Sequence, residues 1–359
     1  MWNKTPATEL LKIKYPIIQG PFGGSFSSAK LVSTVSNLGG MGSFGLNSYS
    51  SEDIERINRE IKNLTEKPYA LNLWVPLKDD PADNYNNKDF EALRKIFNPY
   101  FEEMQIPLPE MLNSQKQDFE LQVESVLRAK PPVASFIYGI PTEEIILEFK
   151  KRGVITMATA TSLEEATKIE EAGIELVITS GSEAGGHRAS FLKPAEKSLI
   201  STRLLVHQIV DKIRIPVIAA GGISNGKDIS DILKLGASAV QMGTVFLATD
   251  ESNASDIHKS KLLSTQPIKT DLTKAYTGRL ARVISNNLSE NFKGSTNKYI
   301  APYPIQSNFL SSFRSTCLEQ KKMDYLAFWS GQPSTILKHR STEKLFGSLI
   351  KEASNFNLI

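Results

Sequence analysis

The sequence predicts a (β/α)₈ barrel, or TIM barrel, from the alternation of two patterns and from their number. Short apolar runs recur along the first 250 residues, and amphipathic helical patterns separate them. Strands that alternate with helices form βαβ units and a parallel sheet. Eight such units in about 250 residues is the strand number and the length of a closed barrel.

The apolar runs are the expected strands, and each is followed by Gly, Pro or polar residues. They are PIIQ (16–19), GMGSFG (40–45), YALNLWV (69–75), PVASFIY (132–138), VITMAT (154–159), ELVITS (175–180), PVIAAG (216–221) and AVQMG (239–243). An open doubly wound sheet is the alternative. It is less favoured, because none of these runs opens a GxGxxG turn and because eight strands close naturally.

The helical patterns between the runs carry boundary signals. In 51–64, isoleucine and leucine recur every three or four residues behind a serine cap at position 50 or 51. The segment 161–173 has a capping-box pattern, Thr161 with Glu164, and ends on glycine. The segment 226–237 also has a glycine, Gly236, at its end.

Two segments do not fit the eightfold unit, which we expect to occupy residues 1–250. Residues 76–131 are longer than one crossover needs, so they predict an insertion after strand three. Residues 251–335 follow the last strand and predict a smaller C-terminal cap over the barrel mouth. Residues 336–359 are expected to form a polar tail.

Composition excludes several classes of protein. The chain has 359 residues, of which 40% are hydrophobic and 23% charged, so wholesale disorder is excluded. The net charge of +3 without a long like-charge block gives no support for binding to nucleic acid or to a membrane surface. A lone cysteine, Cys317, excludes an intrachain disulfide framework. No signal peptide or membrane span is apparent, so we expect a cytoplasmic protein.

The candidate active site follows from the barrel prediction, because barrel enzymes carry their working residues on loops after the strands. Gly221-Gly222 and Gly243-Thr244 follow strands seven and eight. Glycine lets a backbone approach an anion closely, and barrels commonly bind a phosphate at this position. Turn glycines without a ligand are the alternative.

The string EAGGH after strand six contains the candidate catalytic residue. His187 is the histidine that falls on the predicted active face, whereas His207 and His258 lie in helical or linker stretches. A neutral imidazole there serves as a base or as a hydrogen-bond donor. Glu183 in the same loop is expected to cap backbone amides. No His, Cys, Asp and Glu set has metal-ligand spacing, so no metal is expected.

Several strings together resemble the nitronate monooxygenase family, class I, formerly called 2-nitropropane dioxygenases. The resemblance spans about residues 8–335. It rests on YPIIQGP (15–21), NLGGMG (37–42), NLWVP (72–76), PPVASFIYGIP (131–141), GSEAGGHR (181–188), the stretch 216–252, AYTGRLAR (275–282), PYPIQ (302–306) and WSGQ (329–332).

The resemblance implies a barrel that binds FMN without a covalent bond. It also implies that alkyl nitronates such as propionate 3-nitronate are oxidised by O₂ without NAD(P)H, which detoxifies them. The active-site histidine falls on His187, and a tyrosine of the substrate site on Tyr303. The implied flavin contacts fall on Gln19, Gly20, Pro21, Phe22, Asn72, Ser180, Gly185, Gly186, Gly221, Gly222, Gln241, Met242, Gly243 and Thr244.

The sequence departs from the family pattern at two positions. Ser180 stands where the family has Gln, and its shorter side chain has a different hydrogen-bond reach, which affects one flavin contact. Ala189 stands where the family has Gly, and this requires a backbone conformation that alanine tolerates. Arg188 either attracts the substrate anion or faces the protein.

Three alternatives share parts of the same pattern. An FMN- and NADH-dependent enoyl-acyl-carrier-protein reductase has a similar histidine loop and similar glycine loops. A flavin-binding protein without turnover and a barrel enzyme for a phosphorylated substrate are the others. The string NLWVP, the insertion and the tail strings PYPIQ and WSGQ favour the monooxygenase.

Overall fold

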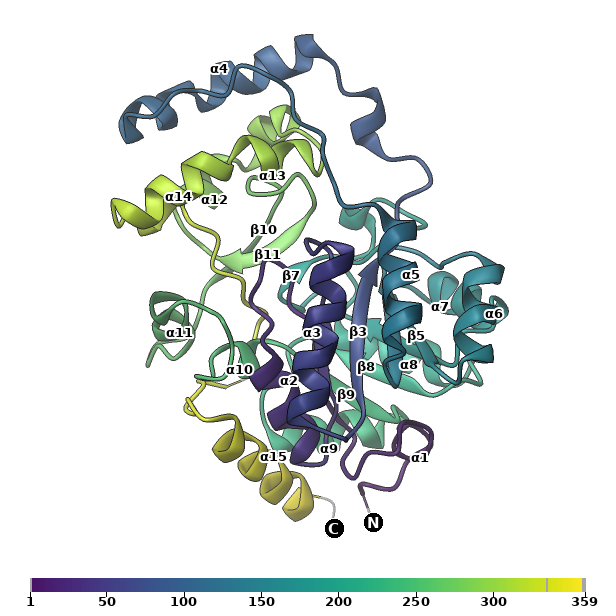
Figure 1. Cartoon of the computed structure of the whole chain (residues 1–359). Coiled ribbons are helices and arrows are strands. Elements are labelled where there is room, and N and C mark those ends of the chain that lie inside the picture. Colours follow the sequence, from purple (N-terminus) through teal and green to yellow (C-terminus); the bar gives the residue numbers. More distant parts are fainter. Residues whose placement is uncertain (1, 334, 357–359) are drawn as a thin grey trace.

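Eight parallel strands close into a barrel in the computed structural model, which describes residues 2–333 and 335–356 (Figure 1). Their order is β1-β9-β8-β6-β5-β4-β3-β2. Met41 closes the ring between β1 and β2, because its N–H donates to Ile17 O at 3.1 Å and its carbonyl accepts from Gln19 N at 2.9 Å. The strands are β1 (Ile17–Gln19), β2 (Gly42–Gly45), β3 (Tyr69–Trp74), β4 (Val133–Ile137), β5 (Ile155–Ala160), β6 (Leu176–Ser180), β8 (Val217–Ala220) and β9 (Ala239–Met242).

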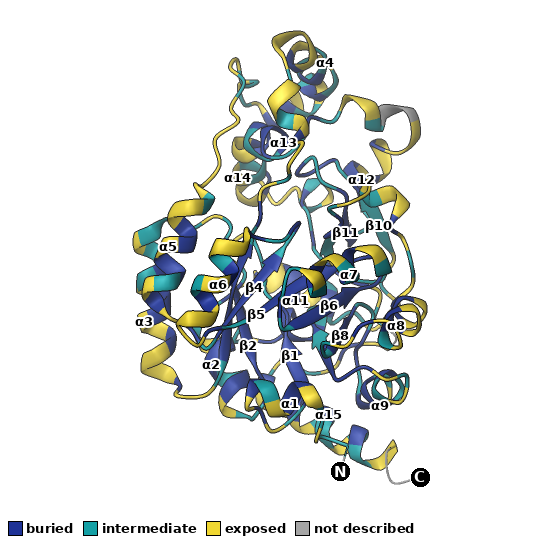
Figure 2. Cartoon of the chain, turned by 90° about the vertical axis from the view of Figure 1, so that its right-hand side faces the viewer, coloured by how far each residue is buried: buried dark blue, intermediate teal, exposed yellow. Residues whose placement is uncertain are grey.

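Every predicted apolar run coincides with one barrel strand to within two residues at each end, and the predicted (β/α)₈ barrel is confirmed. The strands are apolar along their length because both of their faces are buried, as Figure 2 shows in dark blue. The helices around the barrel are α2 (Ala29–Asn37), α3 (Ser51–Leu64), α5 (Phe119–Ala129), α6 (Glu143–Lys151), α7 (Leu163–Glu171), α8 (Thr202–Val210), α9 (Gly226–Lys234) and α15 (Thr342–Phe356).

Helix α7 corrects one predicted boundary. The N-cap is Ser162, whose hydroxyl accepts from the Glu165 amide at 3.2 Å. Glu165, and not Glu164, reaches back to the Thr161 amide, at 2.6 Å. The predicted capping box was therefore one residue out of register. Burial explains the difference, because Glu165 is buried whereas Glu164 pairs with the exposed Lys193.

The C-terminal segment is more than the polar tail that the sequence was expected to form. Helix α15 packs against α9 and α2, where the eighth helix of the barrel belongs. Leu345, Phe346, Leu349 and Ala353 face inward, at the three- and four-residue spacing of an amphipathic helix. Residues 357–359 lie outside the described residues.

The cap is built from two distant parts of the chain. Figures 1 and 2 show α4, from the segment after β3, lying over α13 and α14 from the C-terminal third. Phe97 and Phe101 of α4 pack with Phe309 and Phe313 in one apolar core. The elements of the cap and its connections are α4 (Asn87–Met104), α10 (Thr244–Leu247), α11 (Asp256–Leu262), β10 (Thr270–Thr273), β11 (Ala281–Ile284), α12 (Asn287–Asn291), α13 (Ile305–Phe309) and α14 (Ser311–Glu319).

Short elements complete the chain. Strand β7 pairs with β11, so the loop after β6 joins the small antiparallel sheet β10-β11-β7 of the cap. Helix α1 covers the amino-terminal end of the barrel, where Ala7 and Leu11 pack against barrel residues such as Ile18. These elements are α1 (Pro6–Leu11), β7 (Gly186–His187), η1 (Pro81–Asn84), η2 (Ala195–Lys197), η3 (Gly294–Tyr299) and η4 (Met323–Tyr325).

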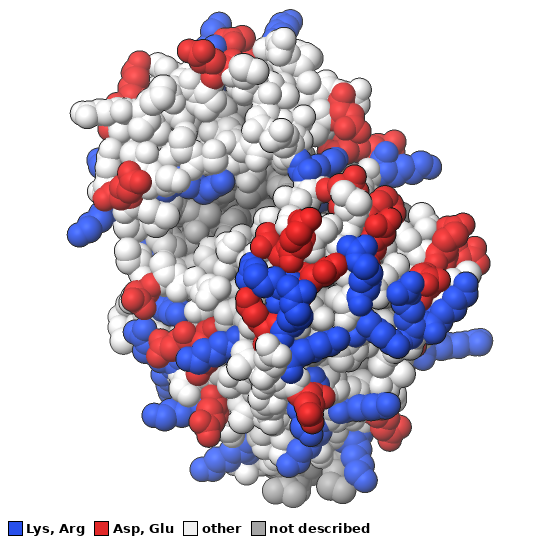
Figure 3. Space-filling model, viewed as in Figure 1, with Lys and Arg blue, Asp and Glu red and all other residues white. Residues whose placement is uncertain are grey.

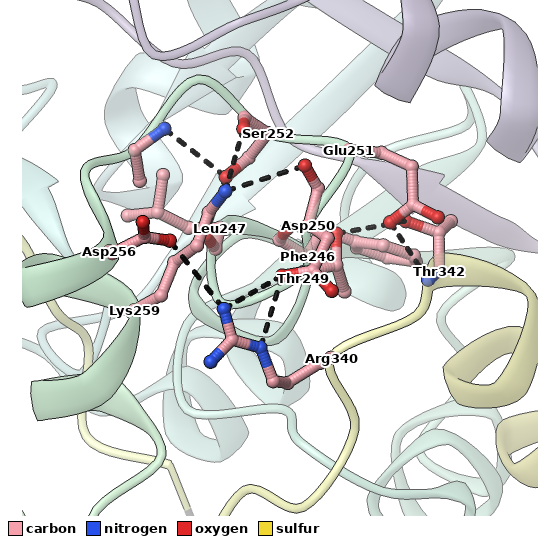
Figure 4. A network of polar contacts seen from close by, with 11 residues as sticks. Phe246, Leu247, Thr249, Asp250, Glu251, Ser252, Asp256, Lys259, Arg340 and Thr342 are labelled. Atoms are coloured by element: carbon pink, nitrogen blue, oxygen red, sulfur yellow. Dashed lines mark hydrogen bonds and ion pairs between the residues drawn. The ribbon is translucent and has the colours of Figure 1, made fainter.

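For the C-terminal part of the cap, the chain leaves the barrel and returns to it at one place, which we call the neck (residues 249–252 and 340–342). Figure 4 shows the polar contacts there. The Glu251 carboxylate accepts from the backbone and hydroxyl of Thr342, at 3.0 and 2.7 Å, and so caps α15. Arg340 pairs with Asp250 at 2.9 Å. The neck therefore ties both ends of this part of the cap to the barrel.

The surface carries charges of both signs. Figure 3 shows Lys, Arg, Asp and Glu mixed over the barrel helices, and a hollow between cap and barrel whose rim is largely uncharged. None of the helices within residues 2–333 and 335–356 combines the length and the apolar character that crossing a membrane requires.

Candidate active site

A cavity of about 1260 Å³ lies between the carboxyl ends of the barrel strands and the cap. Every residue predicted for the site except Gln19 lines it. Gln19 is fully buried, accepts from the Ser43 amide at 3.0 Å and donates to the Gly20 carbonyl, so its side chain braces the barrel wall. The predicted residues at the cavity are Gly20, Pro21, Phe22, Asn72, Ser180, Gly185, Gly186, His187, Gly221, Gly222, Gln241, Met242, Gly243, Thr244 and Tyr303.

The glycines after β8 are required by their backbone conformation, whereas the glycine after β9 is not. Gly221 and Gly222 have φ of 115° and 73°, a region that favours glycine, so the turn alone explains them. Gly243 does not have a positive φ, and a Cβ there would meet only the Phe22 ring, at 3.7 Å. Protein contacts therefore do not demand glycine at 243. The space beside the Gly243 Cα opens into the cavity, which leaves room for a phosphate.

Polar side chains at this rim have unused hydrogen-bonding capacity. Gln241 Oε1 is buried and has no hydrogen-bond partner among the described residues. Such an atom costs about 1–3 kcal/mol, which a bound donor would offset. Thr244 Oγ1 accepts from the Gly331 amide at 2.8 Å, which leaves its own hydrogen to donate. Asn72 donates to Ser135 Oγ at 2.9 Å and keeps its second N–H and its oxygen.

His187 is held in place by backbone pairing and by aromatic rings. It lies opposite Ala281 of β11, between the rings of Trp74 and Trp329, each with its centroid 5.3 Å away. Its Nε2 is 2.9 Å from Thr277 Oγ1. Burial and the nearby Arg279 lower the pKa of His187 to about 3. The imidazole is therefore neutral near pH 7, with one donor and one acceptor nitrogen.

Arg279 is a site residue that sequence reasoning did not single out. Its guanidinium lies over the rings of Tyr138, Tyr303 and Trp74, at 3.9, 4.8 and 5.5 Å from their centroids. Its Nη1 is buried without a hydrogen-bond partner in the described part of the chain. The positive charge therefore stands beside His187 behind an aromatic wall, where it favours an anion in the cavity.

Arg188 and Glu183 hold the loop that carries His187. Arg188 is 2% exposed and donates to the carbonyls of Gly181, Ser180 and Ser198, so it faces the protein and not a substrate. The Glu183 carboxylate accepts from the Thr202 amide at 2.9 Å, which confirms the predicted cap. The two charged neighbours of the GG-His motif thus position its backbone.

Ala189 is buried at the cavity. Its φ does not fall in the positive range, so alanine is unstrained where the family has glycine.

His258 also lines the cavity, although the sequence placed it away from the active face. It is 1% exposed, and burial lowers its pKa to about 4. Its Nε2 lies 2.9 Å from the Trp329 carbonyl, and because a carbonyl only accepts, this nitrogen carries the hydrogen.

The WSGQ string also contacts the loop after β6, because Gln332 N donates to Glu183 O at 2.9 Å. Residues 329–332, the WSGQ string, therefore lie across the barrel rim and hold the cap to it.

Within the described residues, no three His, Cys, Asp or Glu side chains come together as a metal site would need.

The comparisons with known proteins agree with this geometry. A family model described as nitronate monooxygenase matches residues 4–352. The probable nitronate monooxygenase of Staphylococcus aureus (strain Newman) is 35% identical over 353 residues, which is 98% of this chain and 98% of that protein. The corresponding protein of Staphylococcus haemolyticus (strain JCSC1435) is 36% identical over 354 residues, again 98% of both.

Solved structures give the same result for the fold. The nitroalkane oxidase of Streptomyces ansochromogenes superposes with a TM-score of 0.88 at 29% identity and covers 99% of both chains. FabK of Thermotoga maritima has a TM-score of 0.75 at 24% identity over 99% of this chain and 97% of its own, a likeness of fold. The match over nearly the whole chain, with the cavity residues in their expected places, shows that this chain belongs to the nitronate monooxygenase family.

Proposed function

We propose that this protein is an FMN-dependent oxidoreductase that uses O₂ to oxidise alkyl nitronates, such as propionate 3-nitronate, without NAD(P)H. The observation that carries the proposal is the arrangement of one cavity. A neutral His187 beside the Arg279 charge shares that cavity with the glycine loops after β8 and β9. In this role the protein would remove reactive nitronates from the cell.

The residues at the barrel rim fit FMN. Gly243 leaves open space for a phosphate, Thr244 retains a hydroxyl hydrogen, and the buried Gln241 oxygen lacks a donor. Bound FMN would supply the redox chemistry, while the protein binds and orients it. Asn72 and Ser180 face the same cavity from the ends of β3 and β6, where they would contact the flavin.

His187 would act on the substrate side of this site. A nitronate is already an anion, so the imidazole need not remove a proton from it. Its donor nitrogen hydrogen-bonds the nitro oxygens, and the nearby Arg279 stabilises the negative charge. A neutral nitroalkane must lose a proton first. Because Nε2 is engaged with Thr277 Oγ1, Nδ1 would take this proton in the tautomer in which Nε2 donates to Thr277, and would donate to a nitronate in the other tautomer.

The test combines an absorbance spectrum of the purified protein with oxygen consumption on a panel of nitronates. We expect flavin absorbance and rapid oxygen uptake. Colourless protein with no affinity for added FMN would exclude the proposal. Anaerobic bleaching of the flavin by NADH would instead favour the enoyl-acyl-carrier-protein reductase, and a bound flavin without turnover would favour a non-catalytic flavoprotein.

A further inference from the structure

One wall of the cavity is formed by α13 and α14. On α14 the residues that line it recur every three or four positions, which places them on one face of that helix. The wall is polar, with hydroxyl groups and one guanidinium, and it begins just beyond Tyr303. Its residues are Ser307 and Asn308 on α13 and Ser311, Arg314, Ser315 and Leu318 on α14.

The charges around this cavity do not balance. Among the described residues that line it there is no Asp or Glu, and the charged side chains are Lys116 and Arg314. Lys116 is neutralised, because its Nζ lies 3.2 Å from the carboxylate of the buried Asp80. Arg314 is half-buried, and its guanidinium has neither an ion pair nor a hydrogen bond within the described residues.

An unpaired cation in this position is costly unless an anion enters. Burial lowers the pKa of Arg314, because its half-buried guanidinium is partly removed from water. A guanidinium presents a planar fork of donors that matches a carboxylate. The phosphate cradle does not account for it, because Gly243 stands on the barrel rim whereas Arg314 stands on the cap.

The placement of Arg314 puts its charge on the cap side of the cavity. Arg314 lies on α14, whereas Ser307 lies on α13 and is closer in sequence to Tyr303. Long side chains on a helix point back toward its N-terminus, which brings the guanidinium nearer to Tyr303. Trp74 contacts both Tyr303 and His187, so this end of the wall adjoins the reacting end of the cavity.

We propose that Arg314 binds a carboxylate at the end of the substrate remote from the nitronate group. Arg314 is then a specificity-determining residue, which makes this chain prefer nitronates with a carboxylate tail over plain alkyl nitronates. This inference rests on the proposed function, because it assigns the second anchor of the same substrate.

The experiment compares two substrates in matched variants. Propionate 3-nitronate carries the carboxylate, and propyl 1-nitronate lacks it. Arg314→Gln should lower kcat/KM for propionate 3-nitronate by about tenfold to a hundredfold, mostly through KM, as expected for a lost charged hydrogen bond. It should change kcat/KM for propyl 1-nitronate by less than about twofold. Arg314→Lys should recover part of the loss, because it keeps the charge without the fork.

Lys321→Gln is the matched control, because it removes one positive charge just beyond α14 from an exposed side chain that does not line the cavity. It should leave both substrates unaffected. Equal losses for both substrates in Arg314→Gln, or no loss for either, would overturn the inference.

A binding measurement separates this inference from the proposed function. Succinate is close to propionate 3-nitronate in size and charge, and its binding to the purified protein can be followed by calorimetry. We expect wild type to bind succinate and Arg314→Gln to bind it at least about tenfold more weakly. That result would support the role of Arg314 even if no nitronate were oxidised. Equal affinity in both proteins would overturn it.

Discussion

The two sides of the cavity are built in different ways. On the barrel side, Gln241 lies in β9, and Gly222 and Gly243 follow β8 and β9, which are neighbours in the sheet and close in sequence. On the cap side, Arg279 and Arg314 reach the site through a fold assembled from distant segments. The barrel side supplies backbone and amides, whereas the cap side supplies positive charge. Under the proposed function, we therefore expect cofactor binding to reside in the barrel and substrate choice in the cap.

The strongest test of this division is Gly243→Val. The added side chain would fill the cradle after β9, while its Cβ meets only the Phe22 ring within the protein. We expect a folded protein that retains little FMN and has no measurable turnover. The measurement is the flavin-to-protein absorbance ratio, with circular dichroism as the check on folding. Full flavin content in this variant would show that the phosphate is held elsewhere.

His187→Asn should separate the two sides next. The variant should keep its FMN spectrum, because His187 belongs to the cap-side sheet through β11. Turnover of neutral nitroalkanes should fall about 10²–10⁴-fold, as is typical when a general base is removed. Nitronates should lose less, since they need no deprotonation. Oxygen uptake with both substrates decides the matter, and equal losses would exclude the role as a base.

His258 should make the free energy of unfolding depend on pH. The pKa of this buried histidine is about 4 in the folded protein, against an ordinary value of 6.5. Its neutral form therefore favours folding above pH 6.5, and that contribution is lost as the pH falls from 6.5 toward 4. The full loss is about 3 kcal/mol.

Unfolding in urea between pH 7.5 and 4.5 measures this contribution. The stability of His258→Gln should decline less steeply with acid than that of wild type, while the amide still donates to Trp329 O. Parallel pH profiles for the two proteins would show that His258 does not contribute.

Thr277→Val has the smallest expected effect. It removes the hydroxyl that lies 2.9 Å from His187 Nε2, so the imidazole ring is no longer held in one orientation by this contact. The loss of one hydrogen bond predicts a decrease in kcat of about threefold to tenfold. Thr277→Ser should restore the activity, because it returns the hydroxyl. If serine fails to rescue, the threonine acts through packing alone.

The same division explains what the sequence was able to predict. The strands, the glycine loops and His187 lie in short local patterns that the barrel rule converts into positions. Gln19 was assigned to the cavity because its motif borders it, yet its side chain turns into the barrel wall. Arg279, His258 and Arg314 have no local pattern that distinguishes them from surface residues. Their role depends on how the cap folds over the barrel, which one sequence does not reveal.

Helix α15 is a different case, because the spacing of its apolar residues does predict an amphipathic helix. The many charged and polar residues of the same segment favoured a polar tail instead.

The neck has a consequence for how the protein is made. The C-terminal part of the cap is inserted between the eighth strand and the eighth helix, so α15 is synthesised only after that part. During translation the barrel lacks this helix until the whole cap has emerged, and the surface of α2 and α9 that it covers stays open. Removal of α15 would therefore damage the barrel before it damages the cap.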